Sequence, residues 1–421
     1  MAASRTPSAA SRNRAALAGL DGIRGDLTAL YRDLHAHPER AFEEHRTARE
    51  IARHAEAYGY DVTTGVGRTG VVAVLAHGEG PTVLLRADCD ALPVTELTGL
   101  PYASRTEGVM HACGHDMHVT CLLGALKLLA DARDHWRGRI VAVFQPAEET
   151  GQGARAMVDD KLFERFGTPD VVLGQHVAPL PAGMVACHPG PAFAASDSLK
   201  VVMHGTGAHG SRPETSVDPV VMAAATVMRL QTVVSREVPG GETAVLTVGA
   251  LQAGTVDNVI PDRAELRLSI RTYKEEVRAR VRAAVERIVR GEALVAGAER
   301  EPEFTVLDAF PVVENDAAAV ARTMGAVEAV LGDGTVVDPG PVTGSEDVGI
   351  LGTAAGAPVC YWLFGGCDPE AYAAAAAAGT VERDIPSNHS PRFAPEPEPA
   401  VTTGVTALTT AALEWLGHPE G

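Results

Sequence analysis

The sequence lacks the features that would place the protein in a membrane or a secretory pathway. None of its apolar runs reaches the roughly 18 residues that a membrane-spanning helix needs. The first residues, MAASRTPSAASRNRAA, are polar and slightly basic, without the apolar segment of a secretory signal. The cysteines form no CxxC pair and follow no regular spacing, which favours free thiols in a reducing compartment. We therefore expect a cytoplasmic protein with a flexible tail over residues 1–19.

Positive charge is also in short supply. Lysine and arginine number 36 against 54 acidic residues, for a formal net charge of −18. Such a surface repels phosphate backbones and anionic lipid, so we expect neither nucleic acid nor membrane as a partner. Hydrophobic residues make up 46% of the 421 residues. This composition is typical of a globular chain, and the length predicts two domains.

Short apolar runs alternate with helical patterns in the first half of the chain. Strands are predicted at residues 70–75, 82–88, 139–145 and 170–176, and helices at 20–34, 43–58, 119–132 and 154–166. Strands that are apolar along nearly their whole length are typical of a parallel sheet covered on both faces. A further buried strand at 357–366 and a helix at 400–416 continue the pattern near the end. The fold class is therefore α/β with a mainly parallel sheet.

The middle of the chain follows a different order. A strand at 199–205 precedes a helix that begins with Asp218 as N-cap and Pro219. Two strands, a charged helix and a last strand at 301–310 complete a β-α-β-β-α-β unit that resembles a ferredoxin-like domain. We expect this unit, residues 196–310, to be inserted into a catalytic domain formed by residues 20–195 and 311–421.

Candidate ligands gather at the strand ends and in one loop. Asp88 and Asp90 follow the strand at 82–88, Glu148 and Glu149 follow the strand at 139–145, and His176 ends the strand at 170–176. In open α/β sheets, ligands bind beyond the carboxyl ends of the strands. The loop HACGHDMH (111–118) adds Cys113 and His115 around a glycine. Thiolate, imidazole and carboxylate together suit Zn, Co, Ni or Mn better than Mg or Ca.

The adjacent Glu148 and Glu149 are predicted to have different roles. One carboxylate binds metal, and the other can take a proton from a water molecule.

Other motifs leave alternatives open. GTGAHG (205–210) has the form GxGxxG, but no helix follows it, so a dinucleotide site is not expected. Its His209 could donate to an oxyanion or could simply be a hydrogen-bonded turn histidine. Ser345, Glu346 and Asp347 stand before a predicted helix, where capping or function would each explain them. No GxSxG motif is present, which excludes the serine-hydrolase arrangement built on it.

Nine motifs together carry a family resemblance that extends from about Tyr31 to the C-terminus. They are HPERAFEEHRTA, LLRADCDALP, HACGHDMHVTCLLGA, VFQPAEE, GQHV, GAHG with the following RP and DP, NVIPD, GSED and NHSP. The chain resembles the amidohydrolase branch of the aminoacylase/carboxypeptidase-G metallopeptidases, which includes hippurate hydrolases, N-acyl-amino-acid amidohydrolases and indoleacetyl-amino-acid hydrolases.

The resemblance implies a role for each matching residue. It implies two divalent metal ions per subunit, bound by a set of five residues with Cys113 bridging: Cys113, His115, Glu149, His176 and His389. It also implies Glu148 as general acid/base and Asp90 as the residue that orients the site. The inserted domain would act as a lid and form a homodimer or higher homo-oligomer, lending His209 to the partner's site. Asn258 and Arg271 would bind the substrate.

Two positions depart from the wider family. Asp88 stands where the wider family has a metal-binding histidine, and Glu214 stands where this branch usually has another histidine. The role of Asp88 is open at this point, and Glu214 could alter which acids or amides are accepted.

The expected function is metal-dependent hydrolysis of an N-acyl amino acid, a small molecule, to a carboxylic acid and a free amino acid. One alternative is a metallo-dipeptidase or carboxypeptidase, which would recognise a free α-amine. Another is a non-catalytic metal-binding protein of the same fold, although the presence of Glu148 argues against it.

Overall fold

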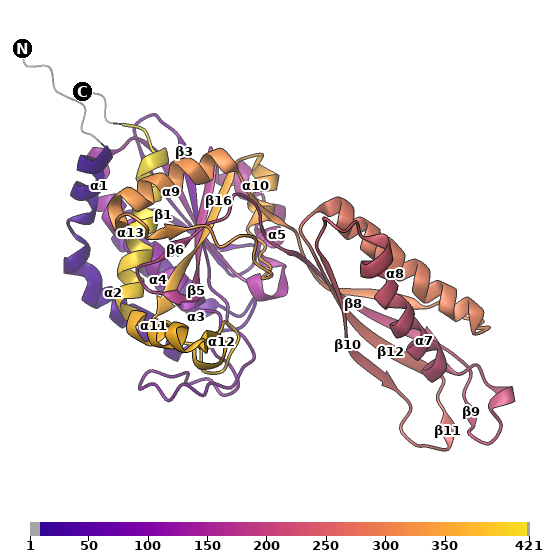
Figure 1. Ribbon diagram of the computed structural model, residues 1–421. Coiled ribbons are helices and arrows are strands. Elements are labelled where there is room, and N and C mark those ends of the chain that lie inside the picture. Colours follow the sequence, from indigo (N-terminus) through magenta and orange to yellow (C-terminus); the bar gives the residue numbers. More distant parts are fainter. Residues whose placement is uncertain (1–8, 419–421) are drawn as a thin grey trace, which may run out of the picture. The chain divides into compact units, whose positions relative to one another are not determined.

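The computed structural model describes residues 9–418, and its chain divides into two compact units (Figure 1). Unit 1 contains the chain up to Gly190, Glu314–Gly340 and the segment from Asp347 onward. Unit 2 contains Pro191–Val313 and Pro341–Glu346. Within the described residues, no helix has the length and apolar character needed to cross a membrane.

Unit 1 is built on an eight-stranded sheet in the order β1-β2-β4-β3-β5-β16-β6-β15. The strands β4, β3, β5 and β16 run parallel to one another in the centre, while β2 and β6 pair with them in antiparallel fashion. The mainly parallel α/β sheet expected from the apolar strand patterns is therefore confirmed. The strands are β1 (Asp61–Val66), β2 (Gly70–His77), β3 (Thr82–Asp88), β4 (Gly138–Gln145), β5 (Val171–Pro181), β6 (Val185–Ala186), β15 (Val336–Val337) and β16 (Val359–Cys367).

Helices cover both faces of this sheet. Val83 and Leu85 of β3 belong to the core that also contains α2, α4, α9 and α13, whereas Leu84, between them, faces away from that core. Burying one such side chain contributes roughly 1.5–3 kcal/mol, so a two-sided sheet favours apolar residues at every position. The helices are α1 (Ala9–Leu17), α2 (Leu20–Ala36), α3 (His45–Ala57), α4 (His115–Asp131), α5 (Gly153–Asp159), α6 (Leu162–Phe166), α9 (Ala317–Leu331), α10 (Gly349–Ala355), α11 (Pro369–Ala378), α12 (Val381–Asp384) and α13 (Pro397–Trp415).

Unit 2 is a two-layer domain. Its four-stranded antiparallel sheet has the order β10-β12-β8-β13, formed by β8 (Ala195–His204), β10 (Ala244–Ala253), β12 (Arg263–Thr272) and β13 (Glu303–Phe310). Helices α7 (Pro219–Thr232) and α8 (Glu275–Val295) share a hydrophobic core with one face of this sheet. The predicted cap of α7 is confirmed, because the Asp218 carboxylate accepts a hydrogen bond from the Val220 amide at 2.8 Å.

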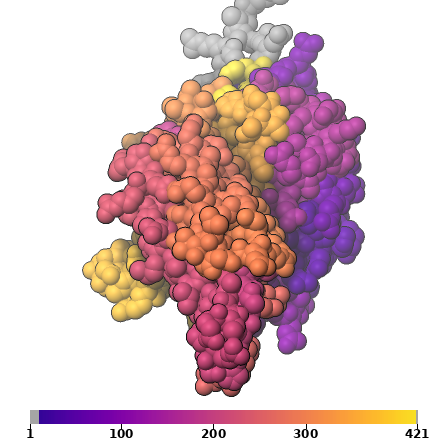
Figure 2. Space-filling model, turned by 90° about the vertical axis from the view of Figure 1, so that its right-hand side faces the viewer, coloured from indigo at the N-terminus to yellow at the C-terminus, as the bar shows by residue number. Residues whose placement is uncertain are grey.

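Unit 2 also carries a small two-stranded ribbon of β9 (Ala208–His209) and β11 (Val259–Ile260). Figure 2 shows the surface of this unit in pink to orange. The short strands β7 (Gly190–Phe193) and β14 (Val313–Asn315) lie where the chain passes between the units.

Several local expectations were wrong. Helix α1 occupies residues 9–17 of the expected tail, whose residues 1–8 lie outside the described part of the chain. The helix expected at 119–132 begins at His115, so half of the supposed HACGHDMH loop is helical. The helix expected at 154–166 is broken between α5 and α6. Helix α10 begins at Gly349 with Val348 at its N-cap, so Ser345 and Asp347 do not cap it.

Candidate metal centre

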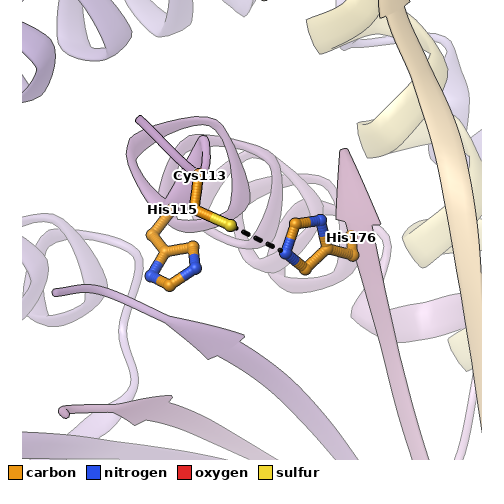
Figure 3. A group of neighbouring side chains, drawn as sticks. All are labelled: Cys113, His115 and His176. Carbon is orange, nitrogen blue, oxygen red and sulfur yellow. Dashed lines mark hydrogen bonds between the residues drawn. The ribbon is translucent and has the colours of Figure 1, made fainter. Parts of the chain in front are cut away.

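The N-terminus of α4 presents Cys113 and His115 at the end of the parallel sheet. Gly114, between them, has a φ of 84°, and a Cβ there would lie 2.3 Å from the Val177 side chain. Only glycine fits this left-handed, crowded position without strain. Figure 3 shows how Cys113 faces His176 of β5, with the Cys113 Sγ 3.4 Å from His176 Nε2.

A second turn places Glu148 and Glu149 beside these residues. It follows β4 and passes through Ala147, whose φ of 50° is unusual for a residue other than glycine. The buried Glu44 carboxylate accepts a hydrogen bond from the Ala147 amide at 2.9 Å. Asp90 accepts bonds from the amides of Glu148 at 3.0 Å and Glu149 at 3.1 Å. Asp90 Oδ1 also lies 3.3 Å from His115 Nδ1, so one carboxylate orients both sides of the cluster.

All five expected ligands and Glu148 come together here. Their ligand atoms form overlapping groups in which every pair of atoms is within 4.8 Å: Cys113 with His115 and His176, Cys113 with Glu149 and His389, and His115 with Glu148 and Glu149. His389 lies in a loop at a φ of 69°, and its Nε2 is 3.5 Å from Glu149 Oε2. Its side chain is 58% exposed, whereas that of Glu149 is 9% exposed.

The donor set fits a pair of transition-metal ions. Among the described residues, His115 Nε2 and Glu149 Oε1 are buried without a hydrogen-bond partner, while His115 Nδ1 has only Asp90 beside it, at 3.3 Å. Buried polar atoms without partners are costly, and a bound cation would satisfy them. Burial also raises the pKa of Glu149 to about 7 and raises that of the Cys113 thiol well above its usual range. A bound cation reverses these effects because it favours the ionised ligands. Sulfur, nitrogen and oxygen donors together suit Zn, Mn, Co or Ni.

The other expected residues belong to unit 2. His209 on β9 pairs with Val259 of β11, and the Gly210 amide donates to the Asn258 carbonyl at 2.7 Å, so His209 and Asn258 lie on one ribbon. Arg271 lies on β12 and donates to the Thr343 carbonyl at 2.6 Å and to Ser345 Oγ at 3.0 Å.

Sequence reasoning left the role of Asp88 open and missed that of His118. Both are fully buried, and the Asp88 Oδ1 lies 2.5 Å from His118 Nδ1. One signal was available, because His118 stands three residues after His115 and such residues share a helix face.

Comparison with known proteins shows the family of the chain. Residues 84–387 match the family described as Peptidase family M20/M25/M40. The chain belongs to this family, and the resemblance drawn from its motifs is confirmed.

Three relatives define its neighbourhood more closely. The chain is 38% identical to an N-acetyl-L-cysteine deacetylase of Bacillus subtilis over 337 residues, 78% of each chain. It is 38% identical to the hippurate hydrolase of Campylobacter jejuni over 332 residues, 78% of this chain and 85% of the relative. A crystal structure of a dinuclear metal-binding peptidase of the M20 family from Bacillus subtilis matches with a TM-score of 0.75 at 29% identity, covering 93% of this chain and 98% of that one. The chain is an enzyme of the amidohydrolase type, acting on amides.

Proposed function

We propose that the protein hydrolyses the amide bond of N-acyl amino acids, releasing a carboxylic acid and a free amino acid. Two divalent ions, drawn from Mn, Zn, Co and Ni, would be held by Cys113, His115, Glu149, His176 and His389. The observation that supports this proposal most directly is the position of Glu148. Its side chain is 6% exposed and lies beside His115 and Glu149, and its backbone amide is fixed by Asp90.

Glu148 performs the proton transfers. When bound, the metal ions polarise the amide carbonyl and lower the pKa of water. Glu148 takes a proton from the attacking water and then delivers it to the nitrogen of the leaving amine. General acid–base catalysis of this kind contributes about 10²–10⁴-fold to the rate. Asp90 supports the transfer by holding the backbone of both glutamates.

Unit 2 supplies groups for the rest of the substrate. The Ser211 amide donates to His209 Nδ1 at 3.1 Å, which leaves the Nε2–H of that ring to donate elsewhere. His209 donates this hydrogen to the oxyanion in the site of a partner subunit, and unit 2 forms the homodimer. Removing one oxyanion donor typically costs about 10²–10³-fold in rate. Asn258 and Arg271 bind the carbonyl or carboxylate side of the substrate. We place the enzyme in the cytoplasm.

The experiment that tests this function is metal-dependent turnover of a defined substrate panel. The protein is stripped with a chelator, reconstituted separately with Mn, Co, Ni or Zn, and assayed for amino-acid release. The panel contains hippurate, N-acetyl, indoleacetyl and dipeptide substrates. Release from acylated substrates, absent in the stripped protein, is the expected result. Faster release from dipeptides with a free α-amine would favour a dipeptidase, and no release with any metal would contradict an enzymatic role.

A further inference from the structure

Asp88 is held by protein groups on both of its oxygens. It ends β3 and is fully buried. Its Oδ2 accepts a hydrogen bond from Arg86 Nη1 at 2.7 Å, and its Oδ1 bonds His118 Nδ1 at 2.5 Å. The Oδ2 atom also lies 3.6 Å from His115 Nε2. Asp88 therefore stands next to an expected ligand, but each of its oxygens already accepts a hydrogen bond, from Arg86 or from His118.

The hydrogen bonds of His118 fix its tautomer. The Val177 amide donates to His118 Nε2 at 2.8 Å, so this nitrogen carries no proton. The proton is on Nδ1, which donates it to Asp88. Both nitrogens of His118 are used within the protein, which leaves none to bind a metal ion.

His118 packs against two expected ligand rings. Its ring centroid lies 4.4 Å from that of His176, with the rings at 68°. It lies 5.3 Å from that of His115, in a stacked arrangement at 29°. A ring in this position limits how far either neighbour can tilt.

Val177 connects His118 to His176. The His176 Nδ1–H donates to the Val177 carbonyl at 2.8 Å, which leaves Nε2 to face the Cys113 sulfur. His118 thus holds the backbone of Val177 in place, and the Val177 carbonyl in turn orients the ring of His176. On the other side of Asp88, Arg86 donates hydrogen bonds to Gln145 at 3.0 Å and to Asp347 at 3.1 Å, which fix its guanidinium group. Outer partners that orient a ligand in this way typically matter 10–100-fold for metal affinity or activity.

We propose that Asp88 and His118 are positioning residues rather than metal ligands: they form one chain that acts through Val177 to set the orientation of His176. Asp88, His115 and His118 lie close enough together to be read as a separate cation site, and the hydrogen bonding of Asp88 and His118 argues against that reading. The inference rests on the proposed function in that it takes His176 as a ligand of its metal centre.

The test is Co²⁺ binding by the full-length protein, measured without substrate. Co²⁺ stoichiometry, affinity in competition with a chelator and the visible absorption spectrum are compared for the wild type, Asp88→Asn, His118→Phe and the double variant. We expect about two Co²⁺ per chain throughout. We expect each single variant to weaken one Co²⁺ about 10–100-fold and to shift its spectrum. The double variant should lose no more than the worse single variant, because both changes break one chain.

Two further variants serve as a conservative replacement and as a control. His118→Gln keeps an acceptor for the Val177 amide and should recover part of the affinity that His118→Phe loses; it also replaces the Phe variant if that does not fold. His111→Phe is the matched control. His111 is equally buried and is close in sequence, but among the described residues it belongs to no group of candidate ligands, so affinity should not change.

Two results would overturn the proposal. If Asp88→Asn bound one Co²⁺ while the His118 variants bound two with wild-type affinity, Asp88 would be a ligand. If the fold losses of Co²⁺ affinity in the two single variants multiplied in the double variant, Asp88 and His118 would act separately. Because binding is measured without turnover, failure to cleave N-acyl amino acids would count against the proposed function alone.

Discussion

Asp90 is the carboxylate that connects the glutamate turn to the start of α4. It accepts the amides of Glu148 and Glu149 and lies beside His115 Nδ1. In Asp90→Asn, one oxygen becomes an NH₂ group that faces a hydrogen-bond donor. We expect kcat to fall about 10–100-fold, with a smaller change in KM, since the acid/base group and a ligand are displaced together. Steady-state kinetics with a fixed metal measure this. An unchanged kcat would mean that the glutamate turn holds its position without Asp90.

At this scale, the sequence could predict which residues gather but not how each one is held. Asp90 and Glu149 follow strand ends, and strand ends of a parallel sheet meet along one edge. The expectation that His176 ends its strand was wrong, because β5 continues to Pro181 and His176 lies within it. The hydrogen bonds of Asp88 depend on the path of α4 and on the side chain of Arg86, and no spacing rule describes these. The unpartnered Nε2 of His115 likewise results from packing in the interior.

At the scale of elements, the start of α4 is a point where close packing positions two expected ligands. Gly114→Ala should destabilise the fold and weaken metal binding, because the added Cβ would press on Val177 beside His176. We expect a loss of about 2 kcal/mol or more in the free energy of unfolding, from strain and overpacking together.

Gly59→Ala is the matched control for that prediction. Gly59 has a similar φ of +88°, but nothing lies within 4 Å of its added Cβ. It should lose only about 1 kcal/mol, from the left-handed backbone alone. Chemical denaturation of both variants gives the comparison. Equal losses would show that contact with Val177 is not the cause.

Element boundaries show where sequence patterns were informative. Apolar strands and the Asp218–Pro219 helix start could be predicted because they depend on local residues. The start of α4 at His115 could not, because its first turn is buried and polar and breaks the expected apolar periodicity. Asp347 looked like a cap by its position in the sequence. It instead binds Arg86, Gln145 and the Ala154 amide across the fold.

For the whole molecule, one buried ion pair predicts a pH dependence of stability. His35 of α2 contacts Asp116 of α4 at 2.6 Å and Glu96 at 3.3 Å. Burial alone would lower the pKa of His35, but these carboxylates raise it from 6.5 to about 10. The protonated form is therefore favoured in the folded state. Its contribution is full below about pH 6.5 and is lost as the pH rises toward 10.

A substitution isolates this contribution. His35→Gln should reduce the free energy of unfolding more at pH 6 than at pH 10, measured by urea denaturation at both values. A deficit that is equal at the two pH values would mean that His35 contributes through packing and not through its charge.

The overall architecture could be predicted from the sequence because the pattern of apolar residues in the strands differs between the two units. Strands apolar throughout mark the sheet of unit 1, and alternating strands such as Arg263–Thr272 mark the two-layer sheet of unit 2. The apolar run of β2 resembles those of the parallel strands and so does not reveal its antiparallel direction, and β6 has only two residues. Strand direction there is set by connections and neighbours and not by composition.

The central claim is that Glu148 transfers protons within an assembled metal centre. The most direct measurement is the kcat of Glu148→Gln on an N-acyl amino acid that the wild type cleaves, together with the metal content of both proteins. Glutamine keeps the shape of the side chain but cannot accept the proton. The account predicts a fall in kcat of at least about 10²-fold with unchanged metal content. Turnover near the wild-type level, with metal still bound, would contradict it.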